Sequence, residues 1–270
     1  MKLENIDKGK SFDWGKTSKD YAKYRDIYPE EFYKAIVDFG LGIAGQNCLD
    51  IGTGTGVIPR NMYKYGAKWT GCDIAENQIL MAKELSIQGG MDIQYFPVAT
   101  EDLNFPEKSF DLISAAQCFM YFKRETALPK IASLLKDDGI LLVLYMAWLP
   151  NKCEITKMSL DSVHKANPDW NGGQTYECPL AFNDFTYSIF DLAFHKEMYV
   201  DVPFTRESWN GRVKACRGIG ASLSPEKIAE WEKEHMNMLE KIMPTETTIP
   251  HFVQMAGLKV KKYIKIVNWK

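Results

Sequence analysis

A glycine-rich turn is the part of the sequence best suited to bind a ligand. Residues 48–60 read CLDIGTGTGVIPR, which is an apolar run, three closely spaced glycines and the start of a helical pattern. A side chain at Gly52 or Gly54 would keep a ligand away from the backbone N–H groups, and we expect the turn to need positive φ angles. The stretch, including Thr53, is therefore predicted to bind a nucleotide-like ligand through its main chain.

Two carboxylates accompany this turn. Asp50 precedes the glycines, and Asp73 stands at the end of a second apolar run at 69–73. A carboxylate about twenty residues after the turn is placed to accept hydrogen bonds from both hydroxyls of a ribose. The dinucleotide fingerprint would need a third glycine at position 57, where this chain has Val57. The spacing thus disfavours a nicotinamide dinucleotide.

The pattern resembles the first motif of the class I S-adenosylmethionine (SAM) methyltransferases. Three further segments follow in the order of that family: residues 72–79 (CDIAENQI), 98–103 (VATEDL) and 105–113 (FPEKSFDLI). The resemblance covers residues 46–148, which are expected to form the SAM-binding core. The sequence departs from the family at Ala99, where an aspartate often accepts the adenine amino group, so that Glu101 or main chain must substitute.

The resemblance implies that Asp73 holds the ribose of SAM, and that Ile74 and Gln78 flank the adenine. Gln117 follows the fourth predicted strand, at the edge where open α/β sheets bind ligands, and is expected either to contact SAM or to cap the next helix. The complete set of expected cofactor-binding residues is Tyr21, Arg25, Asp50, Gly52, Thr53, Gly54, Asp73, Ile74, Gln78, Thr100, Glu101 and Gln117.

Strand and helix patterns alternate through the core and predict a parallel sheet. Strands are expected at about 46–51, 68–73, 92–97, 110–115 and 139–146, and helices at about 29–39, 57–65, 76–88 and 124–135. Two more strands, at about 195–203 and 247–256, are separated by helical patterns at about 205–217 and 224–242. The family resemblance assigns this pair to the antiparallel end of the sheet.

The expected fold class is therefore α/β. A Rossmann-like, seven-stranded and mostly parallel sheet has helices on both faces and an antiparallel last strand, with an N-terminal lid and helical insertions. We expect one domain over residues 1–270.

Aromatic residues crowd the segment before the first strand, at positions 12, 14, 21, 24 and 28, after ten polar residues that we expect to be loosely ordered. Residues 21–31 resemble the lid segment of methyltransferases similar to the trans-aconitate and menaquinone-pathway enzymes, so residues 11–30 are expected to close over SAM. Arg25 would then face the methionine carboxylate or a substrate anion. A surface arginine on an amphipathic helix is the alternative.

Two regions are predicted to cover the substrate. Residues 150–193 lose the regular alternation, and residues 204–243 concentrate tryptophan and arginine between the last two strands. Trp209 would form an apolar wall while Arg212 or Arg217 binds an anionic group, although salt-bridged surface arginines around a core tryptophan fit equally well. The expected substrate-binding residues are Tyr145, Trp148, Trp209 and Arg212.

Composition and charge restrict the partners. A hydrophobic content of 46% excludes disorder as the main state. A net charge of −2, from 33 basic and 35 acidic residues, produces no global field that attracts polyanions, so nucleic acid is not expected. The basic tail is interpreted as an exposed terminal strand or tail; its lysines are Lys259, Lys261, Lys262, Lys265 and Lys270.

Cysteine usage and hydropathy favour a soluble, cytoplasmic protein without a membrane partner. The six cysteines form no Cys-x-x-Cys pair, which fits free thiols in a reducing compartment. The first residues lack an apolar signal core, and the apolar run at 140–149 is too short to span a bilayer. The four histidines are isolated, so no metal is expected. The oligomeric state is not indicated.

The predicted function is transfer of the SAM methyl group to a small-molecule acceptor, leaving S-adenosylhomocysteine. The sulfonium of the cofactor supplies the reactivity, and the protein aligns the reactants and excludes water. His251 and Tyr145 are candidates for a general base on position alone, so the catalytic residue stays unknown. A non-catalytic SAM-binding module is the main alternative, and a nicotinamide-dependent oxidoreductase is a less favoured one.

Overall fold

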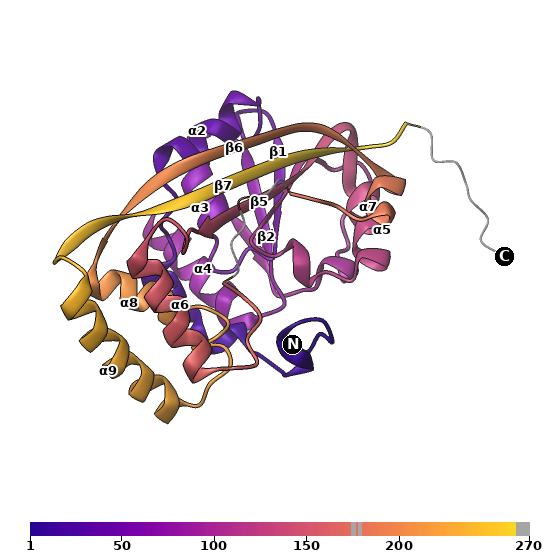
Figure 1. Cartoon of the computed structure of the whole chain (residues 1–270). Helices are drawn as coiled ribbons and strands as arrows, with labels where there is room; N and C mark the ends of the chain where they lie inside the picture. The colour runs from indigo at the N-terminus through magenta and orange to yellow at the C-terminus, as the bar shows by residue number, and fades with distance from the viewer. Residues whose placement is uncertain (174–176, 178–179, 263–270) are drawn as a thin grey trace.

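The predicted alternation builds a central sheet of seven strands (Figure 1). The structure is a computed structural model that describes residues 1–173, 177 and 180–262. Its strands are β1 (Asn47–Ile51), β2 (Lys68–Cys72), β3 (Gln94–Phe96), β4 (Phe110–Ala116), β5 (Leu135–Trp148), β6 (Phe190–Thr205) and β7 (Glu246–Val260). They lie in the order β3-β2-β1-β4-β5-β7-β6, with β1 to β5 parallel and β7 antiparallel to both of its neighbours. The expected fold class is confirmed.

Helices cover both faces of the sheet. In the first half of the chain they are α1 (Ser18–Tyr24), α2 (Glu30–Asp38), α3 (Val57–Met62), α4 (Glu76–Gln88) and α5 (Arg124–Leu134). In the second half they are α6 (Glu154–Ala166), α7 (Asp184–Ile189), α8 (Arg206–Lys214) and α9 (Pro225–Ile242). Alternate residues of β5 belong to different cores: Leu142 and Leu144 pack with α2 and α3, whereas Leu141 and Val143 pack with α5. Burial on both faces explains why the central strands are continuously apolar.

The last three strands are longer than their hydrophobic patterns predicted. β5 begins at Leu135 because this residue pairs with Phe110, four residues before the expected start. β6 begins at Phe190, inside the expected insertion at 150–193, and its outer side chains alternate between exposed and half-buried. The apolar pattern of β6 therefore predicted a strand shorter than the one observed. β7 extends to Val260, so Lys259 lies on a strand, whereas Lys265 and Lys270 lie outside the described residues.

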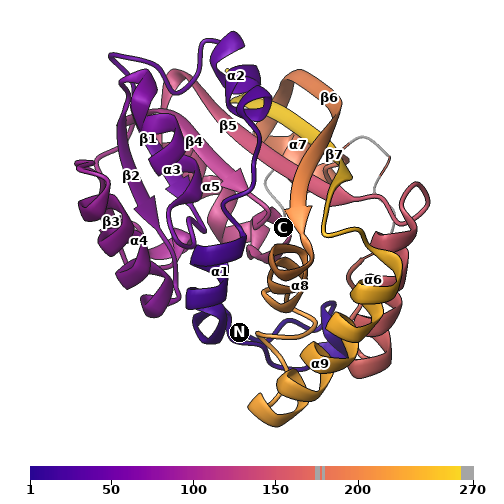
Figure 2. The same cartoon turned by 90° about the vertical axis from the view of Figure 1, so that its left-hand side faces the viewer.

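We call the cover those segments that lie at the carboxyl ends of the parallel strands, namely residues 1–10 and helices α1, α6, α8 and α9. Figure 2 shows α1, α8, α9 and α6 grouped at one end of the sheet, with the N-terminus among them. The first ten residues are packed there, contrary to the expectation that they are loosely ordered: Ile6 and Asp7 are buried. Asp7 accepts two hydrogen bonds from Arg217, at 2.7 Å from Nε and 3.0 Å from Nη2. This ion pair fixes the start of the chain to the turn after α8.

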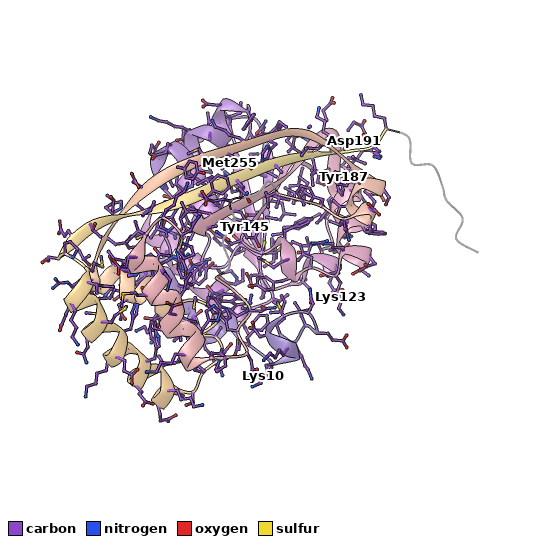
Figure 3. All side chains as sticks on the ribbon, in the orientation of Figure 1. Lys10, Lys123, Tyr145, Tyr187, Asp191 and Met255 are labelled. Carbon is purple, nitrogen blue, oxygen red and sulfur yellow. The ribbon has the colours of Figure 1, made fainter. Side chains whose placement is uncertain are left out.

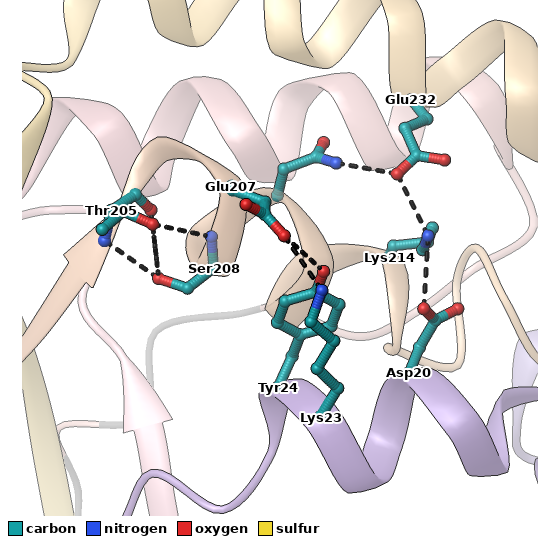
Figure 4. Close-up of polar contacts among 9 residues, drawn as sticks. Asp20, Lys23, Tyr24, Thr205, Glu207, Ser208, Lys214 and Glu232 are labelled. Carbon is teal, nitrogen blue, oxygen red and sulfur yellow. Dashed lines mark hydrogen bonds and ion pairs between the residues drawn. The ribbon is translucent and has the colours of Figure 1, made fainter.

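Local signals account for the ends of these covering helices. Ser224 caps α9 with Pro225 as its first residue, as the sequence predicts. Thr205 and Ser208 form a capping box at the start of α8. The same two residues appear in Figure 4, together with the contacts that join α1, α8 and α9. Lys214 of α8 lies between Asp20 of α1, at 3.2 Å, and Glu232 of α9, at 3.0 Å.

Candidate functional site

One large cavity opens where β4 and β5 end under the cover. Its volume is about 1040 Å³, and its walls include the glycine turn, Asp73, the ends of β4 and β5, Arg212 of α8 and the first residues of the chain. Ligand sites in α/β sheets lie at this edge, and a single drug-sized ligand occupies a pocket of roughly 300–1,000 Å³. The cavity therefore has room for a nucleoside-type cofactor and a small second ligand.

The glycine turn has the left-handed backbone that the sequence predicted. The φ angles are +61° at Gly52, +55° at Gly54 and +75° at Gly56. A Cβ at position 54 would lie 3.4 Å from the Tyr21 ring, within the space above the turn. A Cβ at Gly52 would instead lie 2.8 Å from Cβ of Cys118, so packing of the protein on itself excludes a side chain there.

Asp50 stabilises the turn from below. Its carboxylate is buried and accepts hydrogen bonds from the hydroxyls of Thr53, at 2.7 Å, and Ser114, at 2.6 Å. Burial raises the pKa of Asp50 to about 7, against the effect of these two hydrogen bonds. Asp50 and Thr53 border a small recess beside the turn. Gly52 borders both this recess and the main cavity. Both residues thus shape the turn rather than the wall of the large cavity.

Asp73 lies at the cavity wall, directly after β2. Its two carboxylate oxygens accept the N–H groups of Gly54 and Ala75, each at 2.9 Å. Burial raises the pKa of Asp73. A carboxylate has about four lone-pair sites, so it retains acceptor capacity for a ligand hydroxyl. The side chain therefore links the glycine turn to the second expected motif.

Four of the expected adenine-side residues also line the cavity. Ile74 is 53% exposed, whereas Gln78 is buried and donates a hydrogen bond from Nε2 to the backbone oxygen of Trp14 at 2.9 Å. Its Oε1 is buried and has no hydrogen-bond partner. Thr100 and Glu101 border the same space.

Gln117 occupies a strained position at the end of β4. Its φ is +60°, unusual for a residue other than glycine, and its side chain donates a hydrogen bond to the oxygen of Met146 on β5 at 2.6 Å. It therefore caps no helix, which excludes one of the two expected roles. The residue lines both the main cavity and the small recess.

Residues of the N-terminal segment complete one side of the cavity. Tyr21 and Arg25 line it, and the Arg25 guanidinium carbon lies 4.4 Å from the centroid of the Tyr21 ring. Trp14 lines it too, packed edge-on against Tyr21 and Tyr121. Sequence reasoning placed Trp14 in an aromatic cluster but missed its position at the cavity, because no motif marks it.

The expected acceptor residues divide into two groups. Tyr145, Trp148 and Arg212 line the cavity, and Figure 3 shows Tyr145 near the middle of the molecule. The Tyr145 hydroxyl lies 2.7 Å from Sδ of Met120. Trp209 was expected to form a cavity wall, but it is fully buried, bonded through Nε1 to Ser159, and packs behind Trp148.

Arg217 is the second correction, because its guanidinium is already bound. Besides Asp7, it donates hydrogen bonds to Asn171 and Tyr121.

The general-base candidate His251 is the third correction. It is completely buried outside the cavity wall, and its Nδ1 is bound to the oxygen of Ile249. Burial lowers the pKa of His251 to about 4. Tyr145 is left as the one of the two base candidates that borders the cavity.

Among the described residues, no cluster of three or more histidines, cysteines or carboxylates has the arrangement of a metal site. The five cysteines in this part of the chain are free. None of the described helices has the length and apolar character needed to cross a membrane.

The sheet order and the glycine turn define a Rossmann-like protein. Its cavity lies at the carboxyl ends of the strands, the edge at which proteins of this fold class bind their ligands. Residues 49–143 match the model of a methyltransferase domain. The chain is 32% identical over 128 residues to a ubiquinone biosynthesis O-methyltransferase of Chromobacterium violaceum, covering 47% of this chain and 54% of the relative. It is 31% identical to the enzyme of that name from Xanthomonas euvesicatoria, covering 38% and 44%.

Among solved structures, the YcgJ protein from Bacillus subtilis superposes with a TM-score of 0.54 at 17% identity, covering 86% of this chain and all of that one, a likeness that shows the fold. The chain spans about half the length of the curated relatives it matches. The domain match, the relatives and the fold all point to the class I SAM-dependent methyltransferases.

Proposed function

We propose that the protein transfers the methyl group of SAM to a small-molecule acceptor. The observation that carries this proposal is the single cavity shared by the glycine turn, Asp73 and the ends of β4 and β5, inside a methyltransferase domain. In this proposal the turn faces the amino acid part of SAM, Asp73 accepts the ribose hydroxyls, and Ile74 and Gln78 flank the adenine. The names of the curated relatives support a small acceptor.

The chemistry demands positioning more than acid–base assistance. The S–CH₃ bond breaks as the acceptor atom forms its bond to the methyl carbon, and the electrons of the broken bond stay on sulfur, giving S-adenosylhomocysteine. The chain contributes alignment of the reactants and exclusion of water. Tyr145 would assist only an acceptor that must lose a proton, and we assign no catalytic residue.

Arg25 and Tyr21 form the cofactor side of the proposed lid, residues 11–30. Tyr21 stands over Gly54, and Arg25 over Tyr21, so the guanidinium is near the part of the turn where the methionine carboxylate of SAM would lie. Residues 150–193 and 204–243 are the proposed substrate cover. Because SAM must enter and product must leave, we expect hydrogen exchange at residues 12–28 and in the described part of 150–193 to slow when S-adenosylhomocysteine binds. Equal exchange with and without it would mean a preformed pocket.

Isothermal titration calorimetry with SAM, S-adenosylhomocysteine and NAD tests the cofactor. We expect heat from the first two and none from NAD. Binding of NAD alone would favour an oxidoreductase. Incubation with labelled SAM and a metabolite extract then tests turnover: binding without any labelled product would favour a non-catalytic SAM-binding module.

Two substitutions test the placement of SAM. Asp73→Ala should weaken SAM binding by about 1–3 kcal/mol, because the ribose hydroxyls lose their charged acceptor. Gly54→Val should weaken it more, because the new side chain enters the space between the turn and Tyr21 in a strained backbone. If both variants fold and bind SAM like the parent, the cofactor lies elsewhere.

A further inference from the structure

A buried cation that has no counter-charge among the described residues borders the cavity. Arg212 on α8 is 6% exposed, and its guanidinium carbon lies 4.7 Å from the centroid of the Trp148 ring. Its Nε is enclosed without a hydrogen-bond partner, and no ion pair or hydrogen bond within the described part of the chain involves this side chain. A buried charge is costly unless something compensates it. The side chain is therefore built to meet a ligand.

Two other arginines with largely buried side chains have carboxylate partners. Arg217, five residues later, has the Asp7 carboxylate, and Arg60 has Asp26 at 3.0 Å. Trp148, on which Arg212 stacks, also has a buried indole N–H without a hydrogen-bond partner among the described residues. Two unpartnered donors thus lie together at the end of β5.

A second cation, Arg25, has no ion pair with any residue that the structure describes, and it borders the same recess as Arg212. Arg25 directly follows α1. Helices α1 and α8 are held together by Lys23 and Tyr24 of α1, which both contact Glu207 of α8 (Figure 4). The two helices can approach closely because residue 211 is glycine: a Cβ at Gly211 would lie only 2.5 Å from Cγ of Tyr24. Arg25 and Arg212 consequently border one recess beside the glycine turn. Burial, reinforced by the charge of Arg25, lowers the pKa of Arg212 to about 9.

SAM cannot neutralise both cations. The cofactor carries a sulfonium and an ammonium against one carboxylate, so it adds a net positive charge to the site. If that carboxylate meets Arg25, Arg212 still needs an anion. This step rests on the proposed function.

We propose that the acceptor is a carboxylate-bearing small molecule whose carboxylate is bound by Arg212. Its apolar part packs against Trp148 and Tyr145, which line the cavity next to the guanidinium. Arg25, over Tyr21 and the glycine turn, holds the carboxylate of SAM. The cover then selects the acceptor by charge as well as by shape, because a neutral analogue leaves the guanidinium buried and unpaired.

Matched substitutions separate the two arginines. We expect Arg25→Gln to lower SAM affinity at least tenfold in calorimetry and Arg212→Met to leave it within threefold. A tenfold loss in Arg212→Met would assign this residue to the cofactor and overturn the proposal. Without ligands, Arg212→Met should raise the thermal midpoint by about 2 °C or more, because an unpaired charge leaves the interior. Arg217→Met is the control and should lower the midpoint, because it leaves Asp7 without its partner.

Acid and amide pairs test the acceptor directly. Protein saturated with S-adenosylhomocysteine is titrated with benzoate, 3-phenylpropionate and their amides, followed by ligand-observed NMR. We expect each acid to bind at least tenfold more tightly than its amide, with the difference abolished in Arg212→Met and partly retained in Arg212→Lys. Equal binding, absence of binding by every acid, or a preference that survives Arg212→Met would overturn the proposal. Failure of S-adenosylhomocysteine itself to bind would instead contradict the proposed function.

Discussion

The glycine turn and the cover are held together by different kinds of interaction. The turn depends on left-handed glycines at 52, 54 and 56 and on the carboxylates of Asp50 and Asp73, all of which lie between residues 50 and 73. The cover depends on contacts between residues far apart in the chain, such as Asp7 with Arg217 and Lys23 with Glu207. The main features of the turn therefore come from one short part of the chain and suit a constant ligand. The cover can change its cavity-facing side chains while the turn stays the same.

The largest expected effect is at the turn. Gly56 has a φ of +75°, and a Cβ there would lie 2.9 Å from Cζ of Tyr95. Gly56→Val should lower the free energy of unfolding by about 3–5 kcal/mol, the sum of backbone strain and overpacking. The control is Gly90→Val, with a φ of +66° and no atom within 4 Å of the added Cβ. It should cost only about 1–2 kcal/mol in urea denaturation. Equal losses would show that packing against Tyr95 is unimportant.

The cover should respond most to loss of its buried ion pair. Asp7→Asn keeps the size of the side chain and its tolerance of a positive φ but leaves Arg217 without a counter-charge. We expect a loss of about 3 kcal/mol and faster hydrogen exchange over residues 1–12. Asp169→Asn is the control, because Asp169 pairs with the exposed Lys8 and Lys10 and should cost under about 1 kcal/mol. A similar loss in both variants would contradict the distinction.

Close contact between helices within the cover gives a smaller effect. Helix propensity alone predicts that Gly211→Ala stabilises α8 by about 1 kcal/mol. Because the added methyl group would collide with the Tyr24 ring, we expect a net loss of about 1–3 kcal/mol and weaker SAM binding as α1 and Arg25 move away. Stabilisation with unchanged SAM affinity would show that α1 does not need this contact.

The two regions should also differ in pH dependence. Burial raises the pKa of Asp50 to about 7, so the folded turn binds a proton more readily than the unfolded chain, and this contribution to stability is lost as pH rises from about 4 to 7. Burial lowers the pKa of His235 in α9 to about 4, so its contribution is lost as pH falls from about 6.5 to 4. Each group should contribute a slope of at most about 1.4 kcal/mol per pH unit.

Variants isolate these slopes. The difference in free energy of unfolding between the parent and Asp50→Asn should fall with rising pH over this window. The difference between the parent and His235→Gln should rise. Parallel curves in either comparison would show that the group titrates alike in the folded and unfolded chain.

The sequence predicted the sheet and the turn because both have local signals. Alternating patterns gave β1, β2 and β4 nearly to the residue, and the spacing of Gly52 and Gly54 behind Asp50 predicted a ligand turn. The physical reason for Gly52 was only partly predicted, since its close neighbour Cys118 comes from the end of another strand. Packing between strands has no signature in a local motif.

The acceptor side was less predictable. Trp209 and Arg212 are three residues apart on one helix, yet only Arg212 reaches the cavity, because Trp209 packs between Trp148 and Ser159. In the sequence Arg217 resembled a free cation, but in the structure it pairs with Asp7, which lies 210 residues earlier in the chain. Long-range pairing of this kind decides which cation is left for a ligand, and one sequence does not reveal it.

The position of β7 has a consequence for how the chain folds during synthesis. Among the strands that the structure describes, β7 leaves the ribosome last, yet it fills the gap between β5 and β6. Until residue 260 has emerged, one edge of β5 is unpaired and β6 has no partner in the sheet. The nascent protein therefore carries an open, apolar strand edge from the synthesis of β5 until β7 has emerged, a state prone to aggregation. The arrival of β7, rather than formation of the ligand turn, closes the sheet.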